Sequence, residues 1–265
     1  MRNSNLKKIL DDIYQKFNRR DFVHPDPLEF LYAYGNVRDR EIAGLVAACL
    51  AYGRVAQINT SVWKILRKMG PSPLDFLTET RSRDFSSIYP GFIHRFAKTE
   101  QISALLAGIK NVLEKYGSLY ECFLYRLRPG DENVLPALNF LAGELVAGAN
   151  GNPGHLMPLP ERGSAGKRLH LYLRWMVRKD DVDPGGWDGV PPAKLIVPLD
   201  VHMHRVCTRM EFTHKKQANL KTAMEITNCF REIDPDDPVK YDFSLTRFGI
   251  RKKDDLEDFL IVRKD

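Results

Sequence analysis

The fold of this chain is decided by residues 195–210, whose sequence is LIVPLDVHMHRVCTRM. Pro198 ends an apolar stretch, and Asp200 stands where the N-cap of a helix is expected. The apolar side chains after it recur at helical spacing, at Met203, Val206, Cys207 and Met210. The run therefore predicts a helix over 201–210 that Asp200 caps, an interaction worth roughly 1 kcal/mol.

A capping carboxylate can also do chemistry. The N–H groups and the dipole at a helix N-terminus hold a carboxylate in its ionised form. The two roles of Asp200 are therefore compatible, and neither one excludes the other.

Upstream, residues 163–178 read GSAGKRLHLYLRWMVR and predict a second helix. One face of this helix is apolar, with Leu169, Tyr172, Leu173, Met176 and Val177. Another face carries Lys167, His170, Arg174 and Arg178. A glycine turn that opens a helix exposes N–H groups that suit a phosphate. The alternative is a surface helix whose basic side chains are only solvated.

The remainder of the chain shows helical periodicity and no convincing strand alternation. Helices are expected at about 6–17, 28–34, 41–52, 58–69, 101–116, 119–126, 132–147, 219–233 and 238–248. Residues 148–166 form a loop rich in Gly and Pro. The sequence predicts an all-α fold.

Composition narrows the class of protein. No apolar stretch approaches the ~18 residues of a membrane span, and the first residues lack the pattern of a signal peptide, so we expect a cytoplasmic protein that binds no membrane. The four cysteines form no CxxC pair, which argues against zinc ribbons and iron–sulfur clusters. The net charge of +6 suits a polyanionic partner.

Residues 198–210 resemble the Val-Asp-Thr-His-x-x-Arg-Val-x-Asn-Arg signature of helix-hairpin-helix DNA glycosylases, the endonuclease III superfamily. The matching positions are Asp200, His202, Arg205, Val206 and Arg209. Residues 243–249, FSLTRFG, resemble the closing Leu-x-x-Phe-Gly element of that superfamily. Residues 42–63 loosely resemble its early helix pair, and the whole chain is similar to an uncharacterised bacterial family with Leu-Arg-Trp-Met-Val-Arg and Pro-Leu-Asp-x-His motifs.

The chain departs from the superfamily pattern in two places. Residues 163–167, GSAGK, replace the hairpin Leu-Pro-Gly-Val-Gly-x-Lys-Thr-Ala, and residues 50–54, LAYGR, replace the DNA-contacting Leu-Ser-Gln-Gln-Thr. Lys167 lies 33 positions before Asp200, a longer spacing than usual that resembles the archaeal 8-oxoguanine glycosylase branch. The residue that would wedge into DNA is left unidentified. Arg95 either meets DNA or caps the core.

The resemblance implies a two-lobed fold with a cleft between the lobes, one spanning 36–165 and the other 1–35 plus 166–265. It implies a bifunctional glycosylase and AP lyase for an oxidised base such as 8-oxoguanine. The enzyme would be nucleoid-associated and monomeric on double-stranded DNA, with no cofactor and no metal. Lys167 would be the nucleophile, with Lys194 as its rival, and Asp200 would stabilise charge on the sugar. The DNA contacts would be Gly163, Gly166, Arg168, Arg174, Arg54, His202 and Arg205, and Trp175 and Trp187 would line the base pocket.

Two other interpretations stay open. Asp200, His202 and His204 could bind zinc in a metal-dependent hydrolase, although on a helix residues two apart diverge by about 200°. The protein could also be a non-catalytic DNA-binding protein that keeps the glycosylase fold.

Overall fold

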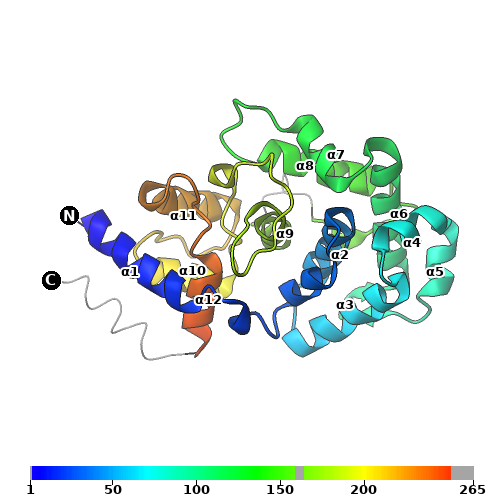
Figure 1. The fold of residues 1–265 in the computed structure, drawn as a ribbon, viewed down its shortest axis with the longest axis horizontal. Helices are drawn as coiled ribbons and strands as arrows, with labels where there is room; N and C mark the ends of the chain where they lie inside the picture. The colour runs from blue at the N-terminus through cyan, green and yellow to red at the C-terminus, as the bar shows by residue number, and fades with distance from the viewer. Residues whose placement is uncertain (1, 159–163, 252–265) are drawn as a thin grey trace.

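The computed structural model describes residues 2–158 and 164–251, and these residues form a helical fold (Figure 1). The α-helices are α1 (Arg2–Phe17), α2 (Val37–Leu50), α3 (Val55–Met69), α4 (Pro73–Glu79), α5 (Phe85–Ile88), α6 (Thr99–Tyr116), α7 (Leu119–Arg126), α8 (Leu135–Ala147), α9 (Lys167–Val177), α10 (Val201–Arg209), α11 (Leu220–Ile233) and α12 (Asp242–Arg251). The short 3-10 helices are η1 (Arg20–Phe22), η2 (Pro27–Ala33), η3 (Ser82–Asp84), η4 (Gly154–Leu156) and η6 (Pro192–Lys194). One antiparallel hairpin joins β1 (Ile93–His94) to β2 (Ala97–Lys98), with Ile93 opposite Lys98 and His94 opposite Ala97.

The all-α class expected from periodicity is confirmed, and the differences lie in short elements. The segment 28–34 is a 3-10 helix, and the helix expected from 132 begins at Leu135. The sequence did not predict α4, α5 or the hairpin. Elements this short carry too few residues for a periodic pattern to show. Only the cap marks α4: Ser72 accepts a hydrogen bond from the Asp75 N–H, and Pro73 follows it.

Helix α9 lies in the middle of the molecule. Every residue from Leu169 to Val177 is buried, and α9 packs against α2. Figure 1 shows α9 between the group α1, α10, α11 and α12 on one side and α2 on the other. The first helix joins the last ones, because α1 packs against α11 and α12.

The described helices were also searched for a membrane span. None of them combines the length and the apolar character needed to cross a bilayer.

Helices α6 and α8 cross with almost no space between their backbones at Gly108. A Cβ added to Gly108 would lie 2.1 Å from the carbonyl oxygen of Leu145. A Cβ added to Gly143, which lies in α8 as Leu145 does, would meet nothing within 4 Å. Only the first glycine is therefore required by packing.

We expect Gly108→Ala to lower the free energy of unfolding by about 3 kcal/mol, because overpacking forces the backbones apart. The matched change Gly143→Ala should raise it by up to about 1 kcal/mol through helix propensity. Urea denaturation of the two variants measures both values, and equal stabilities would show that the helices do not cross this closely.

Candidate functional site

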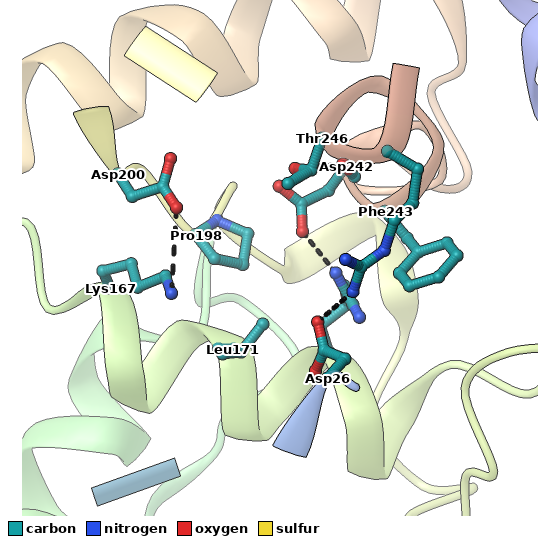
Figure 2. Close-up of a pocket in the computed structure, with 10 residues that line it drawn as sticks. Asp26, Lys167, Leu171, Pro198, Asp200, Asp242, Phe243 and Thr246 are labelled. Carbon is teal, nitrogen blue, oxygen red and sulfur yellow. Dashed lines mark hydrogen bonds and ion pairs between the residues drawn. The ribbon is translucent and has the colours of Figure 1, made fainter. Parts of the chain in front are cut away.

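Asp200 divides its two carboxylate oxygens between two tasks. Oδ1 accepts hydrogen bonds from the backbone N–H groups of His202, at 2.9 Å, and Met203, at 2.8 Å. Asp200 is therefore the N-cap of α10, as the sequence predicts. Oδ2 lies 3.8 Å from the Nζ of Lys167 (Figure 2). The cap fixes the carboxylate and leaves one oxygen facing the lysine.

Lys167 is the first residue of α9 and follows a glycine turn. Gly166 is the N-cap and has a left-handed backbone with φ of 57°, which glycine adopts without the penalty that a Cβ brings. The side chains of Lys167 and Asp200 are 30% and 31% exposed, so solvent and a substrate can reach both.

The structure separates the two candidate lysines. The Nζ of Lys194 donates to the carbonyl oxygens of Arg128, at 3.0 Å, and Pro129, at 2.8 Å. These bonds tie η6 to the chain ahead of α8, which is a structural role. Of the two lysines, Lys167 is the one placed at Asp200.

A pocket lies beside the pair, between α9, α12 and the cap of α10 (Figure 2). Its volume of about 50 Å³ has room for a few water molecules, because each needs roughly 10–15 Å³, and is too small for a base. The pocket is lined by Asp26, Lys167, Leu171, Arg174, Pro198, Asp200, Asp242, Phe243, Thr246 and Arg247. Sequence reasoning missed Asp26, Asp242 and Arg247, although the resemblance of residues 243–249 to a closing element pointed to this helix.

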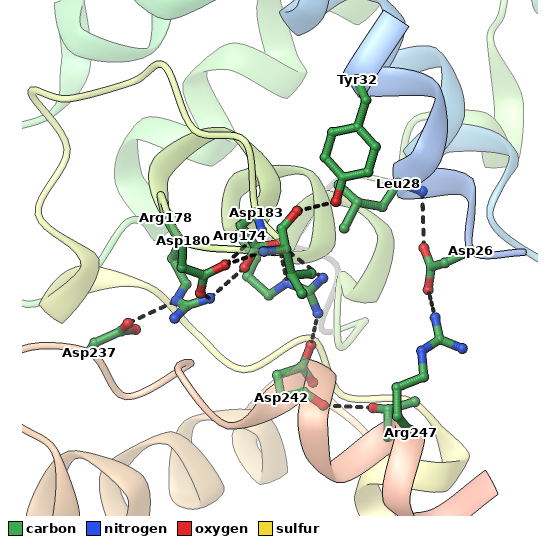
Figure 3. A network of polar contacts seen from close by, with 12 residues as sticks. Asp26, Leu28, Tyr32, Arg174, Arg178, Asp180, Asp183, Asp237, Asp242 and Arg247 are labelled. Atoms are coloured by element: carbon green, nitrogen blue, oxygen red, sulfur yellow. Dashed lines mark hydrogen bonds and ion pairs between the residues drawn. The ribbon is translucent and has the colours of Figure 1, made fainter. Parts of the chain in front are cut away.

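Behind the pocket, a network of buried ion pairs holds α9 (Figure 3). Arg174 pairs with Asp242 and with Asp183, the latter at 3.2 Å. Arg178 pairs with Asp183 and, at 2.8 Å each, with Asp180 and Asp237.

Burial and ion pairing shift the pKa values of the network residues in opposite directions. Burial disfavours the charge on Arg174, but Asp183 and Asp242 outweigh it and raise the pKa of the guanidinium. Burial raises the pKa of Asp183 to about 6, against the opposing effect of Arg174 and Arg178. Burial likewise raises the pKa of Asp242, where Arg174 again opposes it.

The basic face predicted for 167–178 needs correction. Arg174, expected to contact DNA, is 3% exposed and bonded to two carboxylates, so no phosphate can reach it. His170 is buried as well, and burial lowers the pKa of its imidazole to about 4. Periodicity placed these residues on one face but could not show that the opposing surface supplies aspartates.

The two tryptophans expected to line a base pocket lie in the core. Trp175 and Trp187 are fully buried in the core, and the Nε1 of Trp187 donates to the Glu41 carboxylate at 3.0 Å. Neither tryptophan lines the pocket at Lys167. A base could stack on them only if the core opened.

The other expected contacts differ in exposure. Arg54, His202 and Arg205 are exposed. Arg168 is half-buried and donates to the carbonyl oxygens of Cys49 and His155, and Gly166 is buried. Gly163 lies outside the described residues.

The metal interpretation finds no ligand set in the described part of the chain. Across residues 2–158 and 164–251, no group of three or more His, Cys, Asp or Glu side chains is arranged to hold an ion. Asp200, His202 and His204 are not such a group, and the Nε2 of His204 instead meets the carbonyl oxygen of Lys215 at 2.8 Å.

Comparison with known proteins identifies one family. A family model described as a protein of unknown function (DUF2400) matches residues 26–251. No curated protein and no solved structure matches the chain. The matched range includes the pocket and the ion-pair network.

We expect Arg174→Ala to lower the free energy of unfolding by roughly 3–5 kcal/mol, because it leaves buried carboxylates without their partner. The control Arg205→Ala, at an exposed position of α10, should change it by less than about 0.5 kcal/mol. Chemical denaturation measures both. A loss below 1 kcal/mol for Arg174→Ala, within the ~1 kcal/mol usual for an exposed ion pair, would contradict a structural role.

Proposed function

The chain belongs to the DUF2400 family, whose description assigns no activity, and we propose that this member is a DNA glycosylase with AP-lyase activity. The observation that carries the proposal is the Lys167–Asp200 pair, with Nζ 3.8 Å from Oδ2. The pair combines a primary amine at a helix start with a carboxylate held by a cap. The resemblance of residues 198–210 to the glycosylase signature supports the same chemistry.

In the proposed reaction, the Nζ of Lys167 attacks C1′ of the damaged nucleotide. A bond forms from nitrogen to C1′ while the bond from C1′ to the base breaks, and the base leaves with that electron pair and takes up a proton. The Asp200 carboxylate stabilises the positive charge that develops on the sugar. The amine gives up its proton to Oδ2. The C1′–O4′ bond then breaks, the ring oxygen takes the proton held by Asp200, and a Schiff base forms. β-Elimination removes a proton from C2′ as the bond to the 3′ phosphate breaks, and water hydrolyses the Schiff base to free the lysine.

The arrangement of the helices supports a helix-hairpin-helix glycosylase-like fold with two lobes. Helix α1 packs with α11 and α12, as expected if the N-terminal helix belongs with residues 166–265, whereas η2 packs on α2 and α3. The other lobe would comprise 36–165. In this proposal the cleft opens at Lys167, where the start of α9 faces the cap of α10.

The net positive charge of the chain and its exposed basic side chains support double-stranded DNA as the substrate. The chain carries a net charge of +6, and His202 and Arg205 lie exposed on the helix that Asp200 caps. Arg54 is exposed at the N-cap of α3. The protein would act as a monomer on an oxidised base such as 8-oxoguanine. The pocket at the pair is smaller than a base, so the base would sit outside it, with C1′ at Lys167.

Borohydride trapping tests the nucleophile. Duplexes carrying 8-oxoguanine, uracil, thymine glycol or an abasic site are incubated with the protein and reduced, and covalent adducts are separated by electrophoresis. An adduct should form with the wild type and with Lys194→Ala, and disappear with Lys167→Ala, because Lys167, and not Lys194, lies at Asp200. An adduct that survives Lys167→Ala contradicts the assignment. Duplex binding with no adduct on any lesion favours the non-catalytic DNA-binding protein.

Two substitutions at Asp200 separate its cap from its charge. Asp200→Asn keeps an oxygen that can cap α10 and removes the charge, so base excision should slow roughly 10²–10³-fold, the usual effect of one preorganised electrostatic contact. Its stability should match that of the wild type, whereas Asp200→Ala should also lose about 1 kcal/mol of stability. Single-turnover excision and thermal denaturation give the two readouts. Excision at the wild-type rate by Asp200→Asn would rule out an electrostatic role.

A further inference from the structure

The β1–β2 hairpin carries an exposed aromatic side chain at its turn. Phe96 is 72% exposed, more than Tyr125 or Trp63, the other exposed large aromatic residues of the described chain. Ile93, on the adjoining strand, is also mostly exposed. Apart from an edge contact with the His155 imidazole, most of the Phe96 ring faces solvent, where it is available to a partner.

The hairpin that presents Phe96 is rigidly held. His94 is fully buried, with Nδ1 2.9 Å from the Ser61 Oγ and Nε2 3.2 Å from the carbonyl oxygen of Tyr52. The hydroxyl of Tyr52 donates in turn to the carbonyl oxygen of His94, at 3.0 Å. These bonds join the hairpin to α3 and to the end of α2. Phe96 therefore projects from a preorganised support.

The turn itself adopts a conformation that is unusual for its residue. Arg95 has a φ of 53°, a left-handed value that hairpin turns usually assign to Gly, Asn or Asp. Its side chain lies against Gly53, where an added Cβ would come 2.8 Å from the Arg95 Cδ. Strained backbone of this kind persists where surrounding contacts enforce it, and it clusters at functional sites.

A short series of contacts joins the hairpin to the Lys167 site. Arg168, next to Lys167, places its guanidinium 5.1 Å from the centre of the Tyr52 ring and donates to the His155 carbonyl. The imidazole of His155 hydrogen-bonds with the Tyr52 hydroxyl at 2.8 Å. The Phe96 ring and that imidazole form a T-shaped contact, with ring centres 6.1 Å apart. The start of α9 and the turn are thus built into one unit.

Basic side chains lie near the aromatic one, and the Arg95 guanidinium is 5.5 Å from the centre of the Phe96 ring. Arg95 and Lys98 belong to the hairpin, and Arg54 follows Gly53 against which Arg95 packs; all three are exposed. An apolar tip between exposed cations matches the surface of duplex DNA, where phosphates flank a stack of bases.

We propose that Phe96 enters the base stack of duplex DNA at the place vacated by an extruded nucleotide, with Arg95 and Arg54 on the adjacent phosphates. The inference rests on the proposed function, because it takes duplex DNA as the substrate. Extrusion leaves a gap between neighbouring bases, and an aromatic ring that fills it recovers the lost stacking. Phe96 is a positioning residue here and does not touch the reacting atoms.

The test uses the full chain and a duplex that contains tetrahydrofuran, an abasic analogue that Lys167 cannot attack. A 2-aminopurine next to the analogue reports stacking through its fluorescence. The wild type should bind this duplex more tightly than an intact one and change the fluorescence. Phe96→Ala should weaken that preference about tenfold, as expected for one lost base–aromatic contact, and abolish the fluorescence change. Phe96→Trp should restore both.

Two controls make the result specific. Tyr125→Ala removes a similarly exposed aromatic on α7 and should behave as the wild type. Phe96→Ala should keep its affinity for intact duplex within about twofold, since phosphate contacts dominate that binding. The inference is overturned if Phe96→Ala behaves as the wild type, if Tyr125→Ala has the same effect, or if the wild type binds neither duplex. Because the analogue undergoes no chemistry, a dependence on Phe96 without any borohydride adduct would refute the lyase activity and still support insertion.

Discussion

The pairing of Arg174 and Arg178 with buried aspartates is the constraint on which the rest of the structure depends. Two cations in the interior would be prohibitively costly without partners. Asp183 meets both arginines, Asp242 comes from α12, and Asp237 from the chain that leads to it. These pairs lock α9 against the C-terminal helices and so decide where the first residue of α9, Lys167, can lie.

The site is built from two helix starts that face each other. Gly166 turns the chain into α9 and places Lys167 at the opening, while Asp200 caps α10 from the other side. Oδ1 accepts both backbone hydrogen bonds, and Oδ2 faces the lysine. The hydrogen bonds that cap α10 therefore also position the Asp200 carboxylate next to the Lys167 amine.

The surface around this pair differs from the one that the basic composition suggests. Two of the cations on α9 are neutralised inside the protein, so the exposed charge that could meet a polyanion comes from other elements. Arg54 is the N-cap of α3, Arg95 belongs to the hairpin, and Arg205 belongs to α10. The hairpin adds an aromatic tip whose position follows from the buried His94 beneath it.

The sequence by itself determined the features that arise from residues close together along the chain. The helical class, the cap at Asp200 and the glycine turn before Lys167 follow from periodicity and local hydrogen bonding, which act within a few residues. Short elements such as α4 and the hairpin were not predicted, because an element of two to seven residues is too short to show a periodic pattern. Only the tertiary structure decided that Lys167 rather than Lys194 meets Asp200, that Arg174 and the tryptophans are interior, and that Asp26 and Asp242 line the pocket. Burial and ion pairing join residues far apart in the chain, and a linear pattern carries no record of which surfaces will meet.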